Sequence, residues 1–254
     1  MVFAAVGLAL LLLAIYGCCI LPTQWLKVER VRLPLSLGVK ILQISDLHIE
    51  RMRIRPERFA SLIRRERPDL ICLTGDLVDR RLDREKLDRH LAAISGHGAP
   101  VFAVFGNHDY SADAVEALRD MLGDRGIRAL HNECVDMGRF VLVGIDDYCT
   151  GLADPAALGD AAPDQQVVVV THDPTVAWFM DRPFSYLMGG HFHGGQFGIP
   201  FIFRIMDFGP MARSGVYHGL HRHANGTFYI SKGVGQSGIN CRFLVRSEVT
   251  VHEL

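Results

Sequence analysis

Short apolar runs that end in clusters of polar residues constrain the fold of this chain more than any other feature. The runs are rich in β-branched side chains, as in Val39–Ile44, Val101–Phe105 and Val167–Val170, and each has the length of a buried strand. Loops at the carboxyl ends of strands are where open α/β sheets bind their ligands, so the clusters are expected to meet at one edge of a sheet. The clusters are Ser45–His48, Gly75–Asp79, Gly106–Asp109 and Thr171–Asp173.

Segments with helical periodicity alternate with these runs, which indicates a buried sheet in an α/β fold. In the segment 56–67, for example, Phe59, Leu62 and Ile63 fall on one face of a helix. We therefore predict helices at 56–67, 82–94 and 112–123, and strands at 39–44, 69–73, 101–105, 140–145, 167–170, 228–230 and 243–252.

The length and charge of the chain limit its possible functions. Its 254 residues suit one large catalytic domain better than two small ones. Lys and Arg number 27 against 28 Asp and Glu, and this balance argues against a dedicated nucleic-acid-binding protein. The six cysteines form no CxxC pair, so we expect reduced, buried thiols rather than a disulfide framework or a zinc finger.

The N-terminal segment carries no charged side chain from Met1 to Leu26. About 20 apolar residues suffice to span a bilayer as a helix, and Trp25 then falls at the interface, where amphipathic rings accumulate. A signal peptide is one alternative, but it would need a basic start and a small-residue cleavage site, and the segment has neither. A buried core helix is the other, but it would usually have a polar face, which is also missing. We therefore predict a membrane anchor at 1–26, a linker at 27–38 and a catalytic domain at 39–254.

The basic residues after the span predict on which side of the membrane the domain lies. Lys27, Arg30 and Arg32 follow the apolar segment, and the positive-inside rule places such residues in the cytoplasm. We therefore expect an inner-membrane protein, single-pass or anchored, with a cytoplasmic domain.

The polar clusters, together with two later histidines, supply the ligands of a metal site. They offer carboxylate, amide and imidazole groups without a thiolate, a mixture that suits Mn, Fe or Zn. Seven such residues are too many for one tetrahedral ion, whereas two divalent ions sharing a carboxylate would use them all. The candidate ligands are Asp46, His48, Asp76, Asn107, His172, His191 and His193.

These motifs, taken in order, resemble the calcineurin-like metallophosphoesterase family over roughly residues 39–254. They are Asp46-x-His48, Gly75-Asp76, Gly106-Asn107-His108-Asp109, His172 and Gly190-His191-x-His193. The resemblance implies an α-β-β-α sandwich of two sheets and a metal-dependent phosphoric ester or anhydride hydrolase.

The resemblance also implies a role for each residue. One ion would take Asp46, His48, Asp76 and His193, and the other would take Asp76, Asn107, His172 and His191. His108 would serve at the leaving oxygen as an acid or a stabilising charge, with Asp109 orienting it.

Further segments resemble a membrane-associated bacterial branch of the family, whose members often have Thr at the position of Phe192. The segments are 189–196 followed by Phe197-Gly-Ile-Pro200, 215–219 and 231–238.

Basic residues near the first motif are candidates for binding substrate. Arg51, Arg53, Arg55 and Arg58 follow it closely, and Arg matches the geometry of phosphate. A solvated basic loop is the alternative interpretation. His218 is a further candidate contact to a substrate phosphate, and the later histidines 221 and 223 fit a solvated loop.

The predicted function is hydrolysis of a phosphate ester or anhydride at a membrane surface, with no nucleic-acid partner, and the membrane anchor favours a lipid-linked substrate. Within the resembling branch, the UDP-2,3-diacylglucosamine pyrophosphatase of lipid A biosynthesis is the nearest precedent for a substrate. A non-catalytic metal-binding scaffold and a nuclease are the alternatives from other classes.

Overall fold

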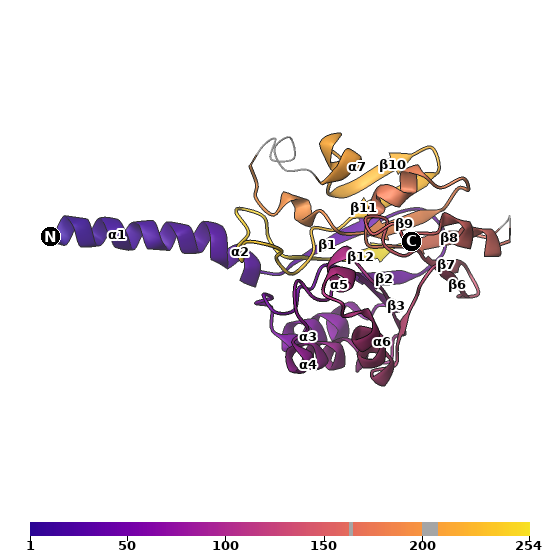
Figure 1. Cartoon of the computed structure of the whole chain (residues 1–254), viewed down its shortest axis with the longest axis horizontal. Coiled ribbons are helices and arrows are strands. Elements are labelled where there is room, and N and C mark those ends of the chain that lie inside the picture. The colour runs from indigo at the N-terminus through magenta and orange to yellow at the C-terminus, as the bar shows by residue number, and fades with distance from the viewer. Residues whose placement is uncertain (163–164, 200–207) are drawn as a thin grey trace.

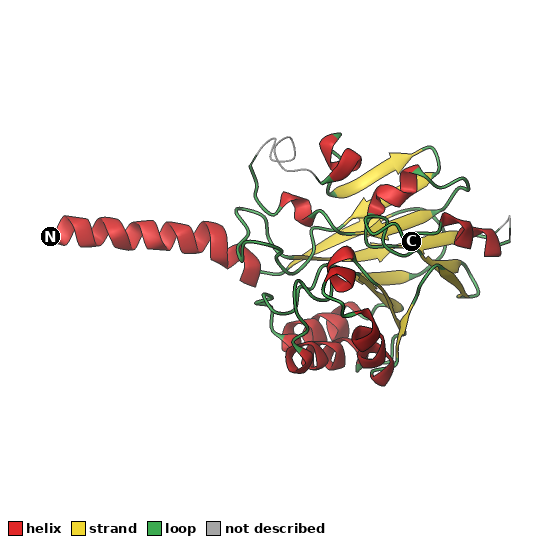
Figure 2. Ribbon diagram, in the orientation of Figure 1, coloured by secondary structure: helices red, strands yellow, loops and turns green. Residues whose placement is uncertain are grey.

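The computed structural model shows a two-sheet domain from which a single N-terminal helix projects (Figures 1 and 2). It describes residues 1–162, 165–199 and 208–254. Pro200, part of one branch-specific segment, lies outside the described residues.

The first sheet consists of six strands in the order β1-β12-β2-β3-β4-β5. All neighbouring strands are parallel except β12 and β2, which are antiparallel. The strands are β1 (Lys27–Arg32), β2 (Lys40–Ile44), β3 (Leu70–Thr74), β4 (Val101–Val104), β5 (Ile127–Ala129) and β12 (Glu248–Glu253).

The second sheet also has six strands, in the order β10-β11-β9-β8-β7-β6. Its central strands are parallel, and an antiparallel strand closes each edge. The strands are β6 (Glu133–Asp136), β7 (Val141–Gly144), β8 (Val167–Val170), β9 (Tyr186–Gly189), β10 (Gly219–His223) and β11 (Gly226–Ile230).

Three apolar layers hold the sandwich together and account for its strand sequences. One layer fills the space between the sheets and includes Ile41, Val104, Val170 and Tyr186. The outer face of the first sheet packs against helices α3 (Pro56–Glu66), α4 (Arg84–Ser95) and α6 (Val115–Asp124). The outer face of the second sheet is covered by the shorter segments η2 (Pro155–Asp160), η3 (Pro174–Trp178) and α7 (Gly209–Arg213). Strands with both faces buried explain why the runs are apolar throughout.

The predicted α-β-β-α sandwich is confirmed, and the predicted strands and helices recur with shifts at their ends. The segment 27–38 is not a linker, because Lys27–Arg32 pairs along its whole length with β12. β1 lies at a sheet edge and has only two apolar residues, Val28 and Val31, among four charged ones, so it lacks the continuous apolar run of the inner strands. The predicted strand 243–252 begins only at Glu248, and β5, β6, β9, β10 and the short helix α5 (Asn107–Ser111) were missed.

The N-terminal helix runs over Val2–Gln24, with a π-helical turn at Tyr16–Ile20. Its 23 residues include an 18-residue stretch with a mean hydropathy of 2.6, and no residue of that stretch is buried against the domain. At 1.5 Å per residue its length is about 35 Å, enough to cross the hydrocarbon of a bilayer.

Strand register places the end of this helix at the same edge of the domain as the polar clusters. β1 begins at Lys27, opposite Glu248 at the start of β12. β12 runs antiparallel to β2, so the start of β12 lies beside the end of β2, where the first polar cluster follows. β3 and β4 run parallel to β2 and therefore end at this edge too. In Figure 1 the helix accordingly leaves the domain on the side where these strands end.

Candidate metal centre

The loops after β2, β3, β4, β8 and β9 bring the seven predicted ligands together, although residues 46 and 193 are far apart in sequence. Five of the seven have a left-handed backbone, with φ between 39° and 74°: Asp46, His48, Asp76, His191 and His193. Such a backbone is uncommon outside glycine and is typical of functional sites, where the surrounding fold holds it in place.

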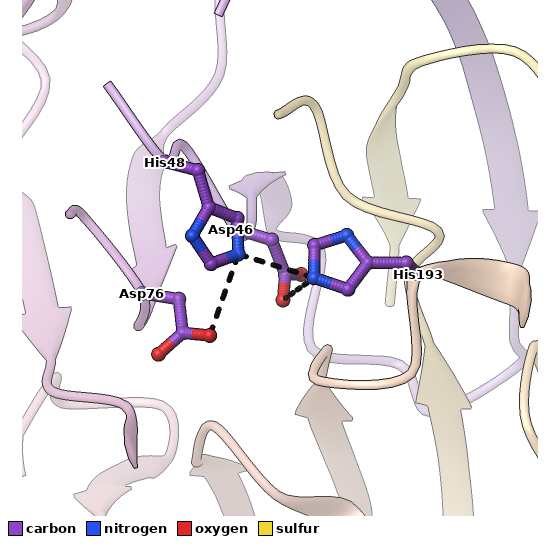
Figure 3. A group of neighbouring side chains, drawn as sticks. All are labelled: Asp46, His48, Asp76 and His193. Atoms are coloured by element: carbon purple, nitrogen blue, oxygen red, sulfur yellow. Dashed lines mark hydrogen bonds and ion pairs between the residues drawn. The ribbon is translucent and has the colours of Figure 1, made fainter. Parts of the chain in front are cut away.

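Four of these residues form the buried group: Asp46, His48, Asp76 and His193 (Figure 3). Their ligand atoms all lie within 4.8 Å of one another. Nε2 of His48 lies 3.1 Å from Nε2 of His193 and 3.5 Å from Oδ2 of Asp76. Nε2 of His193 lies 3.6 Å from Oδ1 of Asp46. The donor atoms thus converge on one point.

The remaining residues form the pocket-side group with Asp76: Asn107, His172 and His191. Nδ1 of His191 lies 3.0 Å from Oδ1 of Asn107 and 3.2 Å from Nε2 of His172. Nε2 of His172 lies 3.3 Å from Oδ2 of Asp76. The same carboxylate oxygen therefore faces His48 of the buried group and His172 of the pocket-side group.

Two observations show that the buried group fits a divalent cation. Oδ2 of Asp46 is buried and has no hydrogen-bond partner among the described residues. The Nε2 atoms of His48 and His193 face each other at 3.1 Å. Two nitrogens that bind the same tetrahedral ion at 2.0–2.1 Å lie roughly 3.4 Å apart, which is close to this distance. A cation would satisfy the orphaned oxygen and both lone pairs.

Glycines allow the loops to approach this closely. A Cβ on Gly106 would collide with Oδ1 of Asp76, and one on Gly190 would collide with Ser45 and Asp46. Both positions exclude any side chain for this reason.

Burial and charge set the protonation of the ligands. Burial lowers the pKa of His48 and, together with His48, lowers that of His193 well below its ordinary value, so both imidazoles are neutral and able to bind a metal. Burial opposes ionisation of Asp76, but the neighbouring His172 outweighs it and holds the pKa of that carboxyl far below its usual range.

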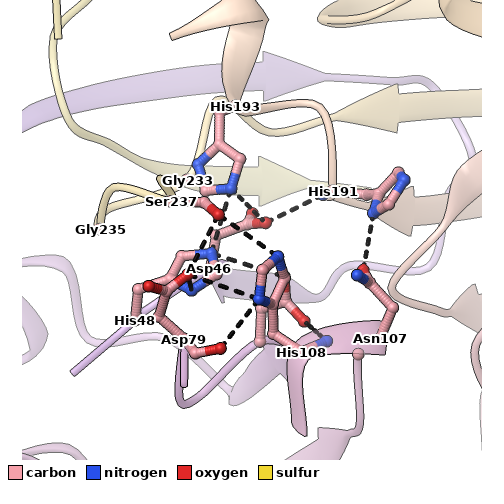
Figure 4. A network of polar contacts seen from close by, with 12 residues as sticks. Asp46, His48, Asp79, Asn107, His108, His191, His193, Gly233, Gly235 and Ser237 are labelled. Atoms are coloured by element: carbon pink, nitrogen blue, oxygen red, sulfur yellow. Dashed lines mark hydrogen bonds and ion pairs between the residues drawn. The ribbon is translucent and has the colours of Figure 1, made fainter. Parts of the chain in front are cut away.

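His108 lies beside both groups without belonging to either (Figure 4). Its Nδ1 donates to the main-chain oxygen of Asp79 at 2.9 Å, and its Nε2 lies 3.3 Å from Oγ of Ser237. Ser237 in turn donates to Oδ1 of Asp79 at 3.1 Å. With the proton of the neutral ring on Nδ1, Nε2 is the nitrogen left to exchange a proton.

The structure gives Asp109 a role different from the predicted orientation of His108. Its Oδ1 accepts a hydrogen bond from the main-chain N–H of Val78, and its Oδ2 accepts one from that of Gly106. Asp109 therefore ties together the loops after β3 and β4, and Asp79 and Ser237 hold the imidazole instead. No spacing in the sequence reveals this, because Ser237 lies 129 residues from His108.

A cavity of 810 Å³ opens onto the centre and is lined by residues of both groups. Asp76, Asn107, His191 and His193 contribute to its floor, together with His108 and Ser237. Tyr148 and Phe208 contribute aromatic surface. A cavity of this size takes a small organic ligand, with its polar end at the metal ligands.

The model of the calcineurin-like phosphoesterase family matches residues 39–195, which contain all seven candidate ligands. The chain belongs to this family. As a metallophosphoesterase it is a metal-dependent hydrolase of phosphate esters, in agreement with the donor atoms gathered at the centre.

Curated relatives of this metallophosphoesterase come from several organisms. The uncharacterized metallophosphoesterase YkoQ of Bacillus subtilis is 36% identical, with 87% of this chain and 86% of the relative covered. The phosphodiesterase YaeI of Escherichia coli is 30% identical over 91% of this chain and 88% of its own. A zebrafish transmembrane protein with a metallophosphoesterase domain is 30% identical, and 54% of it is covered.

The structure separates four of the candidate substrate-binding residues of the metallophosphoesterase: Arg51, Arg53, Arg55 and His218. Arg51 lies next to the centre, with Nε 3.0 Å from Oδ2 of Asp79. Arg53 and Arg55 line a different cavity, beside Gln24 at the end of the N-terminal helix. His218 lines a third cavity, with Lys232 and Arg246. Only the first of the four is therefore close to the metal ligands.

Arg242 supports the metal centre and was missed in the sequence. Its side chain is completely buried, and its guanidinium donates to the main-chain oxygens of Gly235 at 2.6 Å, Lys232 at 2.7 Å and Gly233 at 3.1 Å. A Cβ on Gly233 would lie 2.7 Å from that of Asp46, so this loop forms the wall of the buried group. Burial lowers the pKa of Arg242 to about 10, which leaves it charged at neutral pH.

Proposed function

We propose that this metallophosphoesterase uses two divalent ions to hydrolyse a phosphate ester or anhydride of a membrane-associated substrate. The observation that carries the proposal is the shared edge of the sandwich: the strands that present the metal ligands end where the N-terminal helix enters the domain. If that helix spans a bilayer, the catalytic centre lies on the membrane side of the domain.

The two groups of ligands divide naturally between two ions. The buried group would hold one ion and the pocket-side group the other, and Asp76 would serve both groups, since its Oδ2 faces both His48 and His172. When bound, the ions supply an activated water and neutralise the charge that builds up on the phosphate.

The remaining residues orient the substrate and move protons. His108 stands at the cavity wall with Nδ1 donating to the main-chain oxygen of Asp79, so Nε2 is the nitrogen that can give a proton to the leaving oxygen once the ring is protonated. Arg51 neutralises Asp79, whose carboxylate lies 3.7 Å from Nδ1 of His48. Asp79, paired with Arg51, thus faces two imidazoles, since its Oδ1 also lies 3.4 Å from Nδ1 of His108.

The basic residues after the helix support a cytoplasmic position of the domain at the inner membrane. Lys27, Arg30 and Arg32 all lie on β1, within the first residues after the span. The substrate we propose is therefore a phosphorylated or nucleotide-linked lipid, reached from the cytoplasmic leaflet.

Reconstitution of the full-length protein tests this proposal. Purified protein in nanodiscs, loaded with Mn²⁺, is incubated with bis-p-nitrophenyl phosphate and with a panel of phospholipids, lipid phosphates and UDP-2,3-diacylglucosamine. Products are identified by mass spectrometry. We expect hydrolysis of at least one lipid-linked ester with a higher kcat/KM than that of the soluble ester.

Cleavage of soluble esters with every lipid untouched would remove the lipid part of the proposal and leave the phosphoesterase activity standing. Bound metal is counted in the same samples, and a single tightly bound ion at full activity would contradict the two-ion arrangement. The metal-free protein, prepared with a chelator, is the control.

A further inference from the structure

Three arginines surround a cavity at the point where the N-terminal helix meets the domain. Arg53, Arg55 and Arg58 line this cavity of 360 Å³ together with Ile54 and Gln24, and no carboxylate lines it. Gln24 is the last residue of the helix. The three charges are therefore concentrated at the surface from which the apolar span departs.

The end of the helix is fixed to the domain by main-chain hydrogen bonds. Pro22 has no N–H, so the oxygen of Cys18, four residues earlier, is released from the helix and accepts from the N–H of Leu244 at 3.0 Å. Cys19 accepts from the N–H of Arg242 at 3.0 Å, and Pro22 accepts from that of Ser247 at 2.9 Å. The helix is thus held firmly, and the bilayer it spans has a defined position relative to the arginines.

Arg53 is ordered by contacts with the same two segments. Its Nη1 donates to Oγ1 of Thr23 at 3.1 Å and to the main-chain oxygen of Asn240 at 3.1 Å. Arg55 precedes the first residue of α3, and Arg58 lies in the first turn of that helix. Arg55 and Arg58 are exposed and have no ion-pair partner among the described residues. The neighbouring Glu57 lines an adjoining cavity, which shares Arg53 and Arg55 with this one and where Lys86 and Arg89 add two further positive charges.

Exposed apolar side chains lie on the other segments around the helix end. Trp25 is 55% exposed and stacks against Arg246, and Leu244 and Ile239 in the loop that binds the helix are 62% and 65% exposed. Apolar side chains with aromatic and cationic neighbours are typical of a surface that enters the interfacial region of a bilayer.

We propose that Arg53, Arg55 and Arg58 bind the phosphate headgroup of an anionic lipid in the bilayer that the N-terminal helix spans. Guanidinium groups match phosphate oxygens in pairs, and basic residues next to a span are attracted to anionic leaflets. The cavity is separate from the catalytic one, since none of its residues lines the cavity above the metal ligands. The bound lipid holds the catalytic edge against the membrane surface. This inference rests on the membrane span of the proposed function.

Native mass spectrometry of the full-length protein tests the lipid site without any measurement of turnover. The protein is released from nanodiscs of equal parts phosphatidylcholine and phosphatidylglycerol, and the lipids that remain bound are counted. The wild type is expected to retain phosphatidylglycerol preferentially. In the double variant Arg55→Gln/Arg58→Gln the ratio of the two retained lipids should fall by about 30-fold, the factor expected for two arginines at a membrane surface.

A matched control uses the same two substitutions, Arg to Gln, at the opposite end of the sheets. Arg32 and Arg222 are exposed near the far ends of β1 and β10, and the variant Arg32→Gln/Arg222→Gln should retain lipid as the wild type does. An unchanged ratio in the first variant, or an equal fall in both, overturns the proposal. Displacement of the lipid by glycerol 3-phosphate at equal concentration also overturns it, because the site would then take a soluble phosphate.

Two further measurements distinguish loss of the lipid site from unfolding of the domain and from failure of the N-terminal helix to insert. The melting temperature and metal content of each variant report whether the domain is folded. Extraction of membranes at alkaline pH reports whether the N-terminal helix is inserted: release of the protein overturns the membrane span and this proposal with it, while the phosphoesterase activity is measured independently.

Discussion

The two groups of metal ligands share one carboxylate but differ in their access to solvent. Asp46 and His48 of the buried group are completely inaccessible, and His193 is 5% exposed. In the pocket-side group only His172 is as deeply buried, and Asn107 and His191 are half-buried on the floor of the catalytic cavity. If two ions bind as proposed, this difference predicts that the ion of the buried group exchanges slowly with solvent, whereas the ion of the pocket-side group faces the substrate.

The difference has its origin in the loops that cover each group. The segment 232–235, braced by Arg242, closes over Asp46. The pocket-side group has no such cover among the described residues, and the cavity reaches it directly. Removal of water strengthens electrostatic interactions, so the buried group should bind its ion more tightly.

Replacement of Asp76, the carboxylate that both groups share, should impair both groups at once and have the largest effect on metal binding and hydrolysis. In Asp76→Asn the bridging charge between His48 and His172 is lost, and we expect bound metal and hydrolysis both to fall to background. Metal analysis and turnover of bis-p-nitrophenyl phosphate measure this. Asp120→Asn, at an exposed position of α6, is the control for the same chemical change. Retention of two ions by Asp76→Asn would contradict the bridge.

Replacement of one histidine in each group tests the difference in access. His48→Gly and His191→Gly both remove an imidazole from a left-handed backbone that glycine readily adopts. Added imidazole should restore activity to His191→Gly, because His191 lines the cavity, and not to His48→Gly, because His48 is completely buried and does not line it. Turnover as a function of imidazole concentration measures this, and equal rescue of both variants would refute the comparison.

Removal of His108 should affect catalysis while both groups stay intact. His108→Ala is expected to keep its metal and to lose about 100-fold or more in turnover, the usual scale for an acid–base group. Metal content and kcat are measured on the same preparation. Loss of metal instead would place His108 among the ligands, as its closeness to His48 and Asp79 permits.

The smallest of these effects is expected for Arg51, which acts on the buried group through Asp79. Arg51→Gln removes the ion pair at 3.0 Å and should weaken metal binding by about 10-fold, the lower range for residues that support ligands. Excess metal should then restore most of the turnover. Arg80→Gln, whose exposed side chain lies 3.9 Å from the same carboxylate, is the matched control. If turnover stayed low at saturating metal, Arg51 would act by contacting the substrate rather than by supporting the metal ligands.

Local sequence patterns were sufficient to predict an α/β fold and the chemical types of the ligands, and the resemblance of the motifs to a known family added the two-sheet sandwich. An apolar run followed by a polar cluster is a local pattern, and it recurs wherever a parallel strand ends at a functional edge, as at Ile44 and Val104. The apolar N-terminal segment is equally local, since length and composition alone decide whether a helix can span a bilayer.

Tertiary structure decided how these pieces meet. The register of β1, β12 and β2 puts the helix end and the metal ligands at one edge, and no pattern within 27–38 predicts a strand paired with the C-terminus. The partners of His108, the separation of Arg53 from Arg51 and the brace at Arg242 likewise depend on contacts between distant segments. Local periodicity fixes which face of a strand is buried, whereas pairing between strands, and thus the distance between remote side chains, is fixed only when the sheets assemble.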